Sequence, residues 1–265
     1  LHLDAPVYQL ASPILDNDAF EQLRDVLDDD QVVTIDCTFD IQPDEYGRSQ
    51  EFAMIDRLHE LLEEVAWAVV AQKQIVLTDE GVSTERAALD MPKVVSDIHE
   101  FLLNPSELIE REWLSDALKA KLYDDYLVGD RFGLYRNIKS LREDTAILVR
   151  SAQAISPHSM AVLISCGATA VNPYLAEESI LAEQENGLFQ LDNENPGSET
   201  LVHQFIRAAE NGLLKIMSKV GVQHIGSYRG AMLFETLGLR DDYIKGVKDP
   251  LGGIGRRQRQ RDIVR

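Results

Sequence analysis

The sequence predicts an α/β domain with a mostly parallel sheet whose strands are joined by helical crossovers. Short apolar, β-branched runs alternate with stretches of helical periodicity, and no tight hairpin signal separates the runs. Four or five such strands can be counted, which is too few for a closed eight-stranded barrel. We therefore expect an open sheet or an incomplete, rudimentary (β/α) barrel, with any functional loops at the carboxyl ends of the strands.

Composition narrows the class of protein further. The chain has 265 residues, of which 45% are hydrophobic, enough for a large core in one or two domains. Its net charge of −19 would repel a phosphate backbone, so we expect no nucleic-acid partner. No apolar run approaches the ~20 residues that a membrane span needs. Cys37 and Cys166 both lie in apolar runs, which is typical of buried thiols in a reducing compartment, and we expect a cytoplasmic protein.

The first half of the chain supplies two strands and three helices. The runs QVVTIDCTF (31–39) and KQIVLTDEG (73–81) have the length and β-branched content of strands buried on both faces. Helical segments are predicted at Asp18–Leu27, Gln50–Ala71 and Pro92–Leu103. Residues 105–140 are first amphipathic and highly charged and then aperiodic, so we interpret them as an insertion between regular elements.

The second half continues the alternation. A third buried strand is predicted in DTAILVRSA (144–152), and a helix begins at Ser156–Pro157 and ends at Gly167. TAVNPYLA (169–176) predicts a short strand and a turn, because Pro173 cannot extend a central strand. The remaining predicted elements are a helix over 197–212 with Ser198 as N-cap, a helix over 213–221, a strand over 222–228 and a helix over 230–239.

Several polar residues follow the predicted strands. Asp36 and Asp79 could form a carboxylate pair for acid–base chemistry. Alternatively, Asp36 bonds to the backbone or to a nearby hydroxyl and Asp79 caps the segment that follows it. Asn172 and Ser227–Arg229 are expected at the same edge of the sheet. The histidines are scattered and the two cysteines have no ligand spacing, so no metal site is expected.

The stretch SYRG (227–230) holds the strongest single candidate, Arg229. A predicted strand ends at Ser227 and Tyr228, and Gly230 would let a helix begin close to the sheet. Arg229 at a helix N-terminus could bind an anion, or it could pair with an acid such as Glu235 or Asp36 and fix the corner.

Three long motifs resemble the glutamate synthase large chain in the family's order. They are SPILDNDAFEQLR (12–24), CGATAVNPYLAEESI (166–180) and GLLKIMSKVGVQHIGSYRGAMLFETLGL (212–239). The resemblance is to the central domain, which implies a rudimentary version of the FMN-type (β/α) TIM barrel without flavin. It places the catalytic cysteine in a preceding amidotransferase domain, and FMN and the iron–sulfur cysteines in a following domain. The sequence departs from the family's pattern at TDEG (78–81), KDPLGGIG (248–255) and the 105–140 insertion.

The resemblance implies a domain order and a function. Residues 1–27 would lead in from the amidotransferase domain, 28–250 would form the central domain and 251–265 would link to the FMN-binding domain. The central domain would be non-catalytic, with no cofactor or metal of its own, and would space the two active domains and help wall an ammonia tunnel. Its partners would be those domains and a small reductase subunit.

Two alternatives of other classes remain at this point. A stand-alone flavin- or phosphate-binding enzyme would use Asn172, Arg229 and the GGIG backbone (252–255). An interaction module would bind a partner through an exposed apolar stripe on the 105–140 insertion. The chain does not begin with Met, which favours a fragment or a processed form over a stand-alone enzyme.

Overall fold

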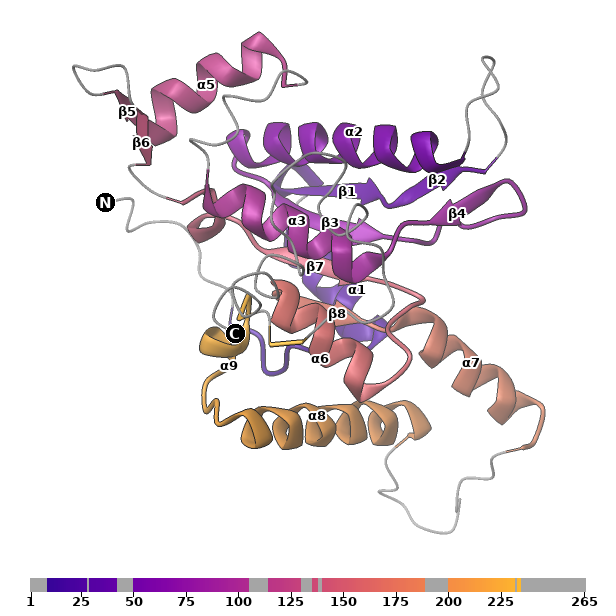
Figure 1. Cartoon of the computed structure of the whole chain (residues 1–265). Coiled ribbons are helices and arrows are strands. Elements are labelled where there is room, and N and C mark those ends of the chain that lie inside the picture. Colours follow the sequence, from indigo (N-terminus) through magenta and orange to yellow (C-terminus); the bar gives the residue numbers. More distant parts are fainter. Residues whose placement is uncertain are drawn as a thin grey trace, which may run out of the picture.

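The central feature is a four-stranded parallel sheet. The computed structural model describes residues 9–27, 29–41, 50–104, 114–129, 135–137, 140–188, 200–231 and 233–234. The strands are β1 (Val32–Asp36), β3 (Gln74–Thr78), β7 (Ile147–Arg150) and β8 (Ala170–Asn172), and they lie side by side in the order in which the chain reaches them (Figure 1). Each adjacent pair is parallel, as the absence of short connections between these runs predicts.

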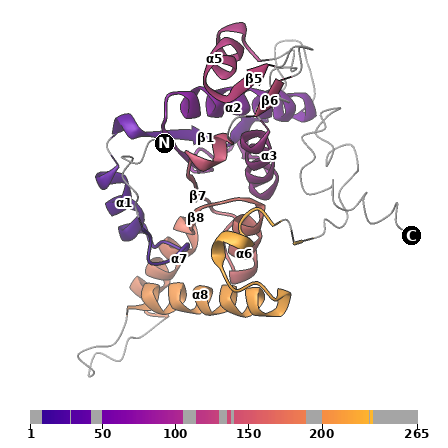
Figure 2. The ribbon, with the colours of Figure 1, turned by 90° about the vertical axis from the view of Figure 1, so that its left-hand side faces the viewer.

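All three crossovers pack helices on one face of this sheet. The helices are α2 (Gln50–Val70), α3 (Met91–Leu103) and α6 (Pro157–Cys166). Their buried residues share one core with alternate strand residues, Ile75, Leu77, Ile147, Val149 and Val171. The other face is covered by α1 (Asn17–Val26), whose Phe20 packs in a second, smaller core (Figure 2). In a (β/α) barrel, consecutive strands are neighbours and all crossover helices lie on one side of the sheet. The same arrangement is present here in an open four-stranded sheet, so the predicted incomplete α/β fold is confirmed.

Two short antiparallel ladders accompany the main sheet, which the sequence did not predict. The run 31–39 is not one strand, because the chain turns at Cys37, where β2 (Thr38–Asp40) begins a ladder with β4 (Arg86–Ala88). At the turn, Cys37 N donates to Thr78 O at 2.7 Å and Cys37 O accepts from Leu89 N at 2.8 Å. The second ladder joins β5 (Leu127–Gly129) to β6 (Tyr135–Asn137) within the insertion.

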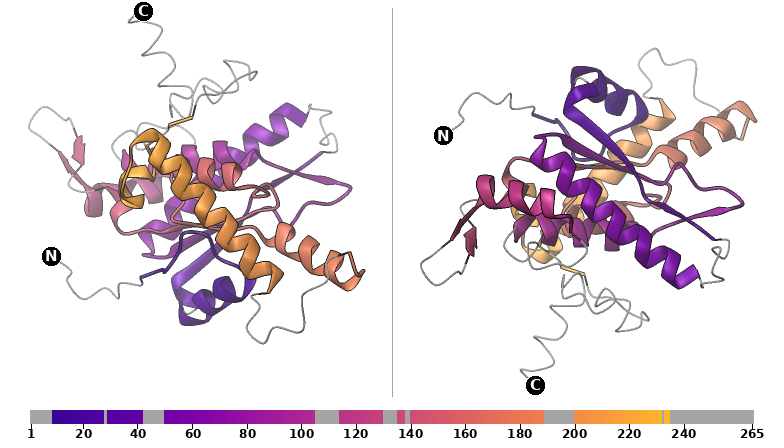
Figure 3. Two further views of the ribbon diagram at one scale, coloured as in Figure 1. Left: turned by 90° about the horizontal axis from the view of Figure 1, so that it is seen from below. Right: turned by 90° about the horizontal axis from the view of Figure 1, so that it is seen from above.

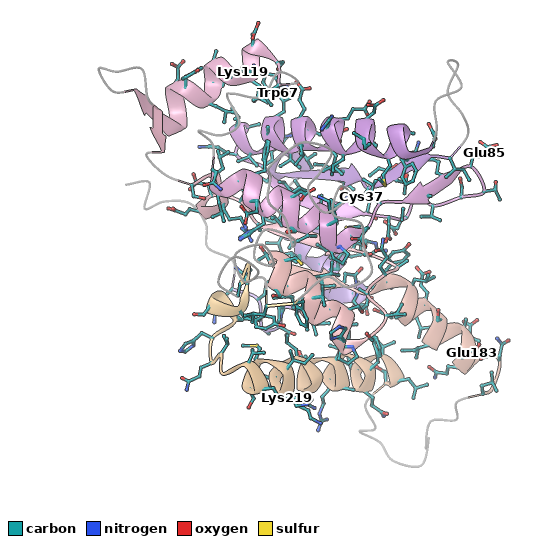
Figure 4. All side chains as sticks on the ribbon, viewed as in Figure 1. Cys37, Trp67, Glu85, Lys119, Glu183 and Lys219 are labelled. Atoms are coloured by element: carbon teal, nitrogen blue, oxygen red, sulfur yellow. The ribbon has the colours of Figure 1, made fainter. Side chains whose placement is uncertain are left out.

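The insertion is anchored on the main core. Its helix α5 (Asp116–Tyr126) lies against α2, as the views in Figures 1 and 3 agree. Three leucines of the insertion, Leu114, Leu118 and Leu122, are fully or almost fully buried in the main core. At the edge of this contact, Lys121 Nζ lies 5.2 Å from the ring centroid of Trp67, which Figure 4 labels near the end of α2. The leucines described between 114 and 124 are therefore packed inside the chain, and Ala117 and Ala120 are the exposed apolar residues described there.

The helices after β8 differ from the prediction. Helix α7 (Tyr174–Glu185) follows Pro173 directly and was not predicted. Helix α8 (Leu201–Val220) is one helix where two were predicted, with Thr200 as its N-cap; the expected cap, Ser198, lies outside the described residues. Gly212 lies inside α8 and does not end a helix. Its missing side chain allows the close contact where α8 crosses α6 (Figure 3), since a Cβ on Gly212 would lie 2.5 Å from Cβ of Pro157.

The predicted strand over 222–228 is wrong. Residues Ile225–Tyr228 form a short helix, α9, after an irregular segment that begins at the left-handed Gly221. The described residues of the predicted helix over 230–239 that follow Gly230, namely Ala231, Leu233 and Phe234, are not helical, and the rest of that stretch lies outside the description. As a result, the SYRG stretch lies at a different end of the sheet from the one that the sequence predicted.

The lead-in segment joins the sheet beside β8. Leu15 N donates to Val171 O at 2.9 Å, and Val171 N donates to Pro13 O at 2.8 Å, so Ile14 forms a parallel bridge to Val171. Two short 3₁₀ turns, η1 (Asp29–Gln31) and η2 (Leu141–Glu143), precede β1 and β7. None of the described helices has both the length and the apolar content that crossing a bilayer requires.

Candidate functional site

Four polar residues form one row at the carboxyl end of the sheet. Asp36 pairs in register with Thr78, Thr78 with Arg150, and Arg150 with Asn172. Residues in register on parallel strands point to the same face, so this row is where a barrel-like fold would carry a reaction centre. The row spans three strand spacings, or about 14 Å, between Asp36 and Asn172.

Asp36 is held by a hydroxyl and a guanidinium. Its Oδ1 accepts from Thr38 N at 3.0 Å and from Thr38 Oγ1 at 2.8 Å, which is the local hydroxyl bonding that the sequence offered as one alternative. Its Oδ2 accepts from Arg86 Nη2 at 3.0 Å, and Arg86 also binds Asp40 at 3.1 Å. These bonds tie the end of β1 to the β2–β4 ladder.

Asp79 has a different set of partners. Its side chain is almost fully buried and accepts from Ser151 Oγ at 2.6 Å and from Ala152 N at 2.8 Å. The carboxylate thus fixes the loop after β7, and only the backbone O of Asp79 serves the following segment, through Val82 N at 3.2 Å. Among the described residues, the side chains of Asp36 and Asp79 have no hydrogen-bond partner in common.

Asn172 is fully buried, and both polar atoms of its amide are hydrogen-bonded. Nδ2 donates to Leu15 O and to Asn17 Oδ1, both at 3.0 Å, and Oδ1 accepts from Arg150 Nη1 at 3.0 Å. Arg150, which the sequence did not single out, also donates to Glu80 at 2.9 Å. Its Cζ lies 5.2 Å from the ring centroid of Phe20 and 5.3 Å from that of Tyr174.

The polar side chains at the carboxyl end of the sheet are therefore hydrogen-bonded within the chain. Each polar group singled out there from the sequence already has a partner within the chain, and these partners join strands, loops and the lead-in segment. The bonds of Asp79, Ser151 and Asn172 fix geometry most firmly, because these side chains are buried and losing a partner would leave a buried polar group unsatisfied.

The SYRG stretch lies at the opposite end of the sheet. Arg229 Nη2 donates to Thr169 O at 3.5 Å, and Thr169 directly precedes β8, whereas Asn172 ends that strand. The two residues are thus separated by the length of β8, about 10 Å along the strand. The expectation that Ser227–Arg229 joins Asn172 at the carboxyl edge is wrong, because it rested on a strand over 222–228 that does not form.

Within SYRG, the residues have separate surroundings. Ser227 is exposed, whereas Tyr228 is fully buried and its hydroxyl donates to Ala161 O at 3.2 Å. Burial, with the nearby Cys166 thiol, raises the pKa of Tyr228 to about 12. Gly230 has a φ of 67° and its N donates to Ile164 O at 3.3 Å. Tyr228 and Gly230 therefore attach the α9 segment to α6.

Beside this corner lie residues that the sequence did not bring together. Arg142, in η2, donates from Nε to His99 Nδ1 at 3.3 Å and from Nη2 to Gly167 O at 2.9 Å and Thr169 Oγ1 at 3.0 Å. We call His99, Arg142, Thr169 and Arg229 the amino-edge cluster. No local motif could reveal it, because its members come from α3, η2, the segment before β8 and the residue after α9.

The imidazole in this cluster is neutral near pH 7. Burial, together with the smaller effects of the charges of Arg142 and Arg229, lowers the pKa of His99 to about 4. Because Nδ1 accepts from Arg142, the ring proton is assigned to Nε2. The Nε2 side of the ring faces Gly230, where a Cβ would lie 2.7 Å from Cε1 of His99 and closer still to Nε2.

A buried ion pair lies on the same helix, α3. Lys93 Nζ pairs with Asp97 Oδ2, and both side chains are less than a tenth exposed, while Asp97 Oδ1 has no hydrogen-bond partner. Burial raises the pKa of Asp97, and Lys93 opposes this shift. Burial, helped by the charges of Asp90 and Asp97, raises the pKa of Cys166 to about 12, and burial raises that of Cys37 as well. Both thiols are therefore protonated at neutral pH.

Among the described residues, no group of three or more His, Cys, Asp or Glu side chains could hold a metal ion. The geometry defines a class of protein: an open α/β domain, wound like part of a (β/α) barrel, whose carboxyl edge is closed by internal hydrogen bonds. The family model "Glutamate synthase central domain" matches residues 2–240. The chain belongs to this family, and the resemblance stated from the sequence motifs is confirmed.

The relatives that match this chain are much longer than it is. It is 30% identical over 264 residues to the NADPH glutamate synthase large chain of Azospirillum brasilense, covering 97% of this chain and 14% of that one. It is 29% identical over 242 residues to the NADH glutamate synthase of Schizosaccharomyces pombe, covering 89% of this chain and 9% of that one. It is 37% identical over 120 residues to the large chain of Bacillus subtilis, covering 44% and 8%. The chain therefore spans about a seventh or less of these relatives.

Proposed function

We propose that this chain is a non-catalytic central domain of a glutamate synthase. Residues 28–250 would form the domain, 1–27 its lead-in from an amidotransferase domain and 251–265 its linker towards an FMN-binding domain. The observation that carries the proposal is the family match over residues 2–240 together with a carboxyl edge whose candidate residues are all bonded internally.

In this role the domain would be a spacer between two active sites. The parent enzyme would make L-glutamate from 2-oxoglutarate and glutamine-derived ammonia, with electrons passing through an iron–sulfur cluster and FMN held by other parts of the polypeptide. Free ammonia would escape or become protonated in water, so its transfer needs a shielded route more than it needs reactive groups. A rigid wall with saturated polar groups suits that requirement, because it offers few donors or acceptors to retain the passing molecule.

The partners in this proposal are the amidotransferase and FMN domains of the same polypeptide and a small reductase subunit, in the cytoplasm. The internal bonding of the sheet edge supports the spacer role over the flavin- or phosphate-binding alternative. That alternative required Asn172 and Arg229 in one site, and they lie at opposite ends of β8.

A flavin titration of the purified 265-residue chain tests the proposal. The chain is mixed with FMN, passed through gel filtration, and its visible spectrum and melting temperature are measured, with Asn172→Ala as a variant of the alternative site. For the unsubstituted 265-residue chain, we expect that no flavin is retained and that the melting temperature does not change. Stoichiometric FMN on the protein, lost in Asn172→Ala, would contradict the spacer role and identify a cofactor site.

A further inference from the structure

Two guanidinium groups meet in the amino-edge cluster, and no carboxylate of the described residues pairs with either of them. Arg142 donates to His99 Nδ1, Thr145 O, Gly167 O and Thr169 Oγ1, and all four acceptors are neutral. Arg229 has one long bond, from Nη2 to Thr169 O, and its buried Nε has no partner. Neither arginine forms an ion pair with a described acid, whereas Arg57, Arg86 and Arg150 all do.

This arrangement is unfavourable as it stands. Both guanidinium groups end on Thr169, one on its hydroxyl and one on its carbonyl, so two like charges lie close together in a partly buried place. Burial, and then the charge of Arg229, lower the pKa of Arg142 to about 10. His99, being neutral, offers no compensating charge. The whole chain is strongly acidic, with a net charge of −19, yet neither arginine forms an ion pair with a described acid.

The local backbone holds the two arginines in this position. The His99 ring is confined between Gly167 and Gly230, where a Cβ on Gly167 would lie 2.6 Å from Cγ of His99. Gly230 adopts a left-handed φ directly after Arg229, and Gly167 supplies the carbonyl that Arg142 binds. The fold therefore fixes two unbalanced guanidinium groups with donors to spare, which is the chemistry that binds planar or tetrahedral oxyanions.

We propose that the amino-edge cluster is an oxyanion-binding site in which Arg142 and Arg229 together hold one carboxylate or phosphate group. Arg229 contributes its unpartnered Nε–H and the remaining N–H of its fork, and Arg142 contributes charge from a position fixed by His99 and Gly167. The group can come from a free small anion or from an acidic side chain of an adjoining domain. The site stands on the contacts of this chain and does not depend on the spacer role.

The test is thermal unfolding of the full 265-residue chain in sodium phosphate, sodium acetate and sodium chloride at equal ionic strength. At an anion concentration about ten times the Kd, we expect phosphate or acetate to raise Tm by about 3 °C relative to chloride. The variant Arg229→Gln loses this difference, and Arg229→Lys, which keeps the charge without the fork, retains part of it. Arg24→Gln is the matched control, because Arg24 is an exposed arginine with only a 3.9 Å contact to Glu21, and it keeps the full response.

The two probes also separate the two sources. A response to phosphate alone indicates a phosphate or a phosphorylated small molecule, and an equal response to acetate indicates a carboxylate such as an Asp or Glu side chain would present. A Tm difference that is the same in the parent and Arg229→Gln is a general salt effect and overturns the proposal, as does the absence of any difference. A flavin bound in the earlier titration would contradict the spacer role and leave this result standing.

Discussion

Replacing Gly230 by Ala should be far more damaging than replacing a glycine with the same backbone conformation elsewhere. Gly230 and Gly221 have φ values of 67° and 76°, so both replacements place an L side chain in the left-handed region. That conformation costs about 1 kcal/mol for alanine. At Gly221 nothing lies within 4 Å of the added Cβ, so the backbone cost is the whole effect.

At Gly230 the added Cβ overlaps the His99 ring, with Cε1 at 2.7 Å and Cδ2 at 3.0 Å. The ring cannot move away easily, because Arg142 holds its Nδ1 and Gly167 lies against its other side. Overpacking of this kind adds about 2 kcal/mol, which gives a total of about 3 kcal/mol for Gly230→Ala against about 1 kcal/mol for Gly221→Ala.

Urea unfolding followed by far-UV circular dichroism and tryptophan fluorescence measures both variants. A double-mutant cycle with His99→Ala isolates the contact, since removing the ring should reduce the cost of Gly230→Ala to the backbone value of about 1 kcal/mol. Equal destabilisation by the two glycine replacements, or an unchanged cost in the His99→Ala background, would refute the proposed packing of His99 on Gly230.

Three further predictions follow from the buried titratable groups. The pKa of His99 in the folded chain, about 4, lies below its ordinary value of 6.5, so on acidification the unfolded chain binds a proton first. The free energy of unfolding should therefore fall by up to about 3 kcal/mol between pH 6.5 and 4. Urea unfolding at a series of pH values measures this loss, and His99→Gln should remove it. Lys93→Met should cost about 3 to 5 kcal/mol in the same assay because it leaves Asp97 buried and unpaired, whereas Lys93→Met with Asp97→Leu should cost far less; a double variant as unstable as the single one would contradict this. Cys37 and Cys166 should react with a thiol reagent at pH 8 only after unfolding, and fast labelling of the folded chain would show that the burial of these thiols is wrong.

The local signals in the sequence predicted most of the sheet and the helices that cover it. The runs at 73–81 and 144–152 contain β3 and β7, and the Ser156, Pro157 and Gly167 signals bound α6 as expected, because caps and periodicity act over a few residues. The errors came from tertiary packing. In the sequence, Gly212 has the appearance of a helix end, but in the structure it allows α6 to approach α8 closely. No sequence feature near Gly212 indicates its contact with Pro157.

The candidate site shows the same division more sharply. Asp36 bonds to a hydroxyl two residues away, which local chemistry could suggest. The partners of Asp79 lie more than seventy residues along the chain, and Arg142 meets His99 across 43 residues, so neither contact has a sequence signature. One misjudged element had the largest consequence: interpreting 222–228 as a strand moved Arg229 to the wrong end of the sheet and gave it Asn172 as a companion.

The two ends of the sheet therefore invite different interpretations of the same polar residue types. At the carboxyl end, where barrel-like folds carry their chemistry, Arg150 is balanced by Glu80 and contacts two aromatic rings, and nothing in its bonding calls for a further ligand. At the amino end, the acceptors that the described residues offer to Arg142 and Arg229 are all neutral, in a chain with 45 acidic residues against 26 basic ones. An unbalanced pair in so acidic a chain is costly unless something anionic arrives from outside the described residues. For a domain proposed to sit between others, the amino end is thus the side on which the charges favour an incoming contact.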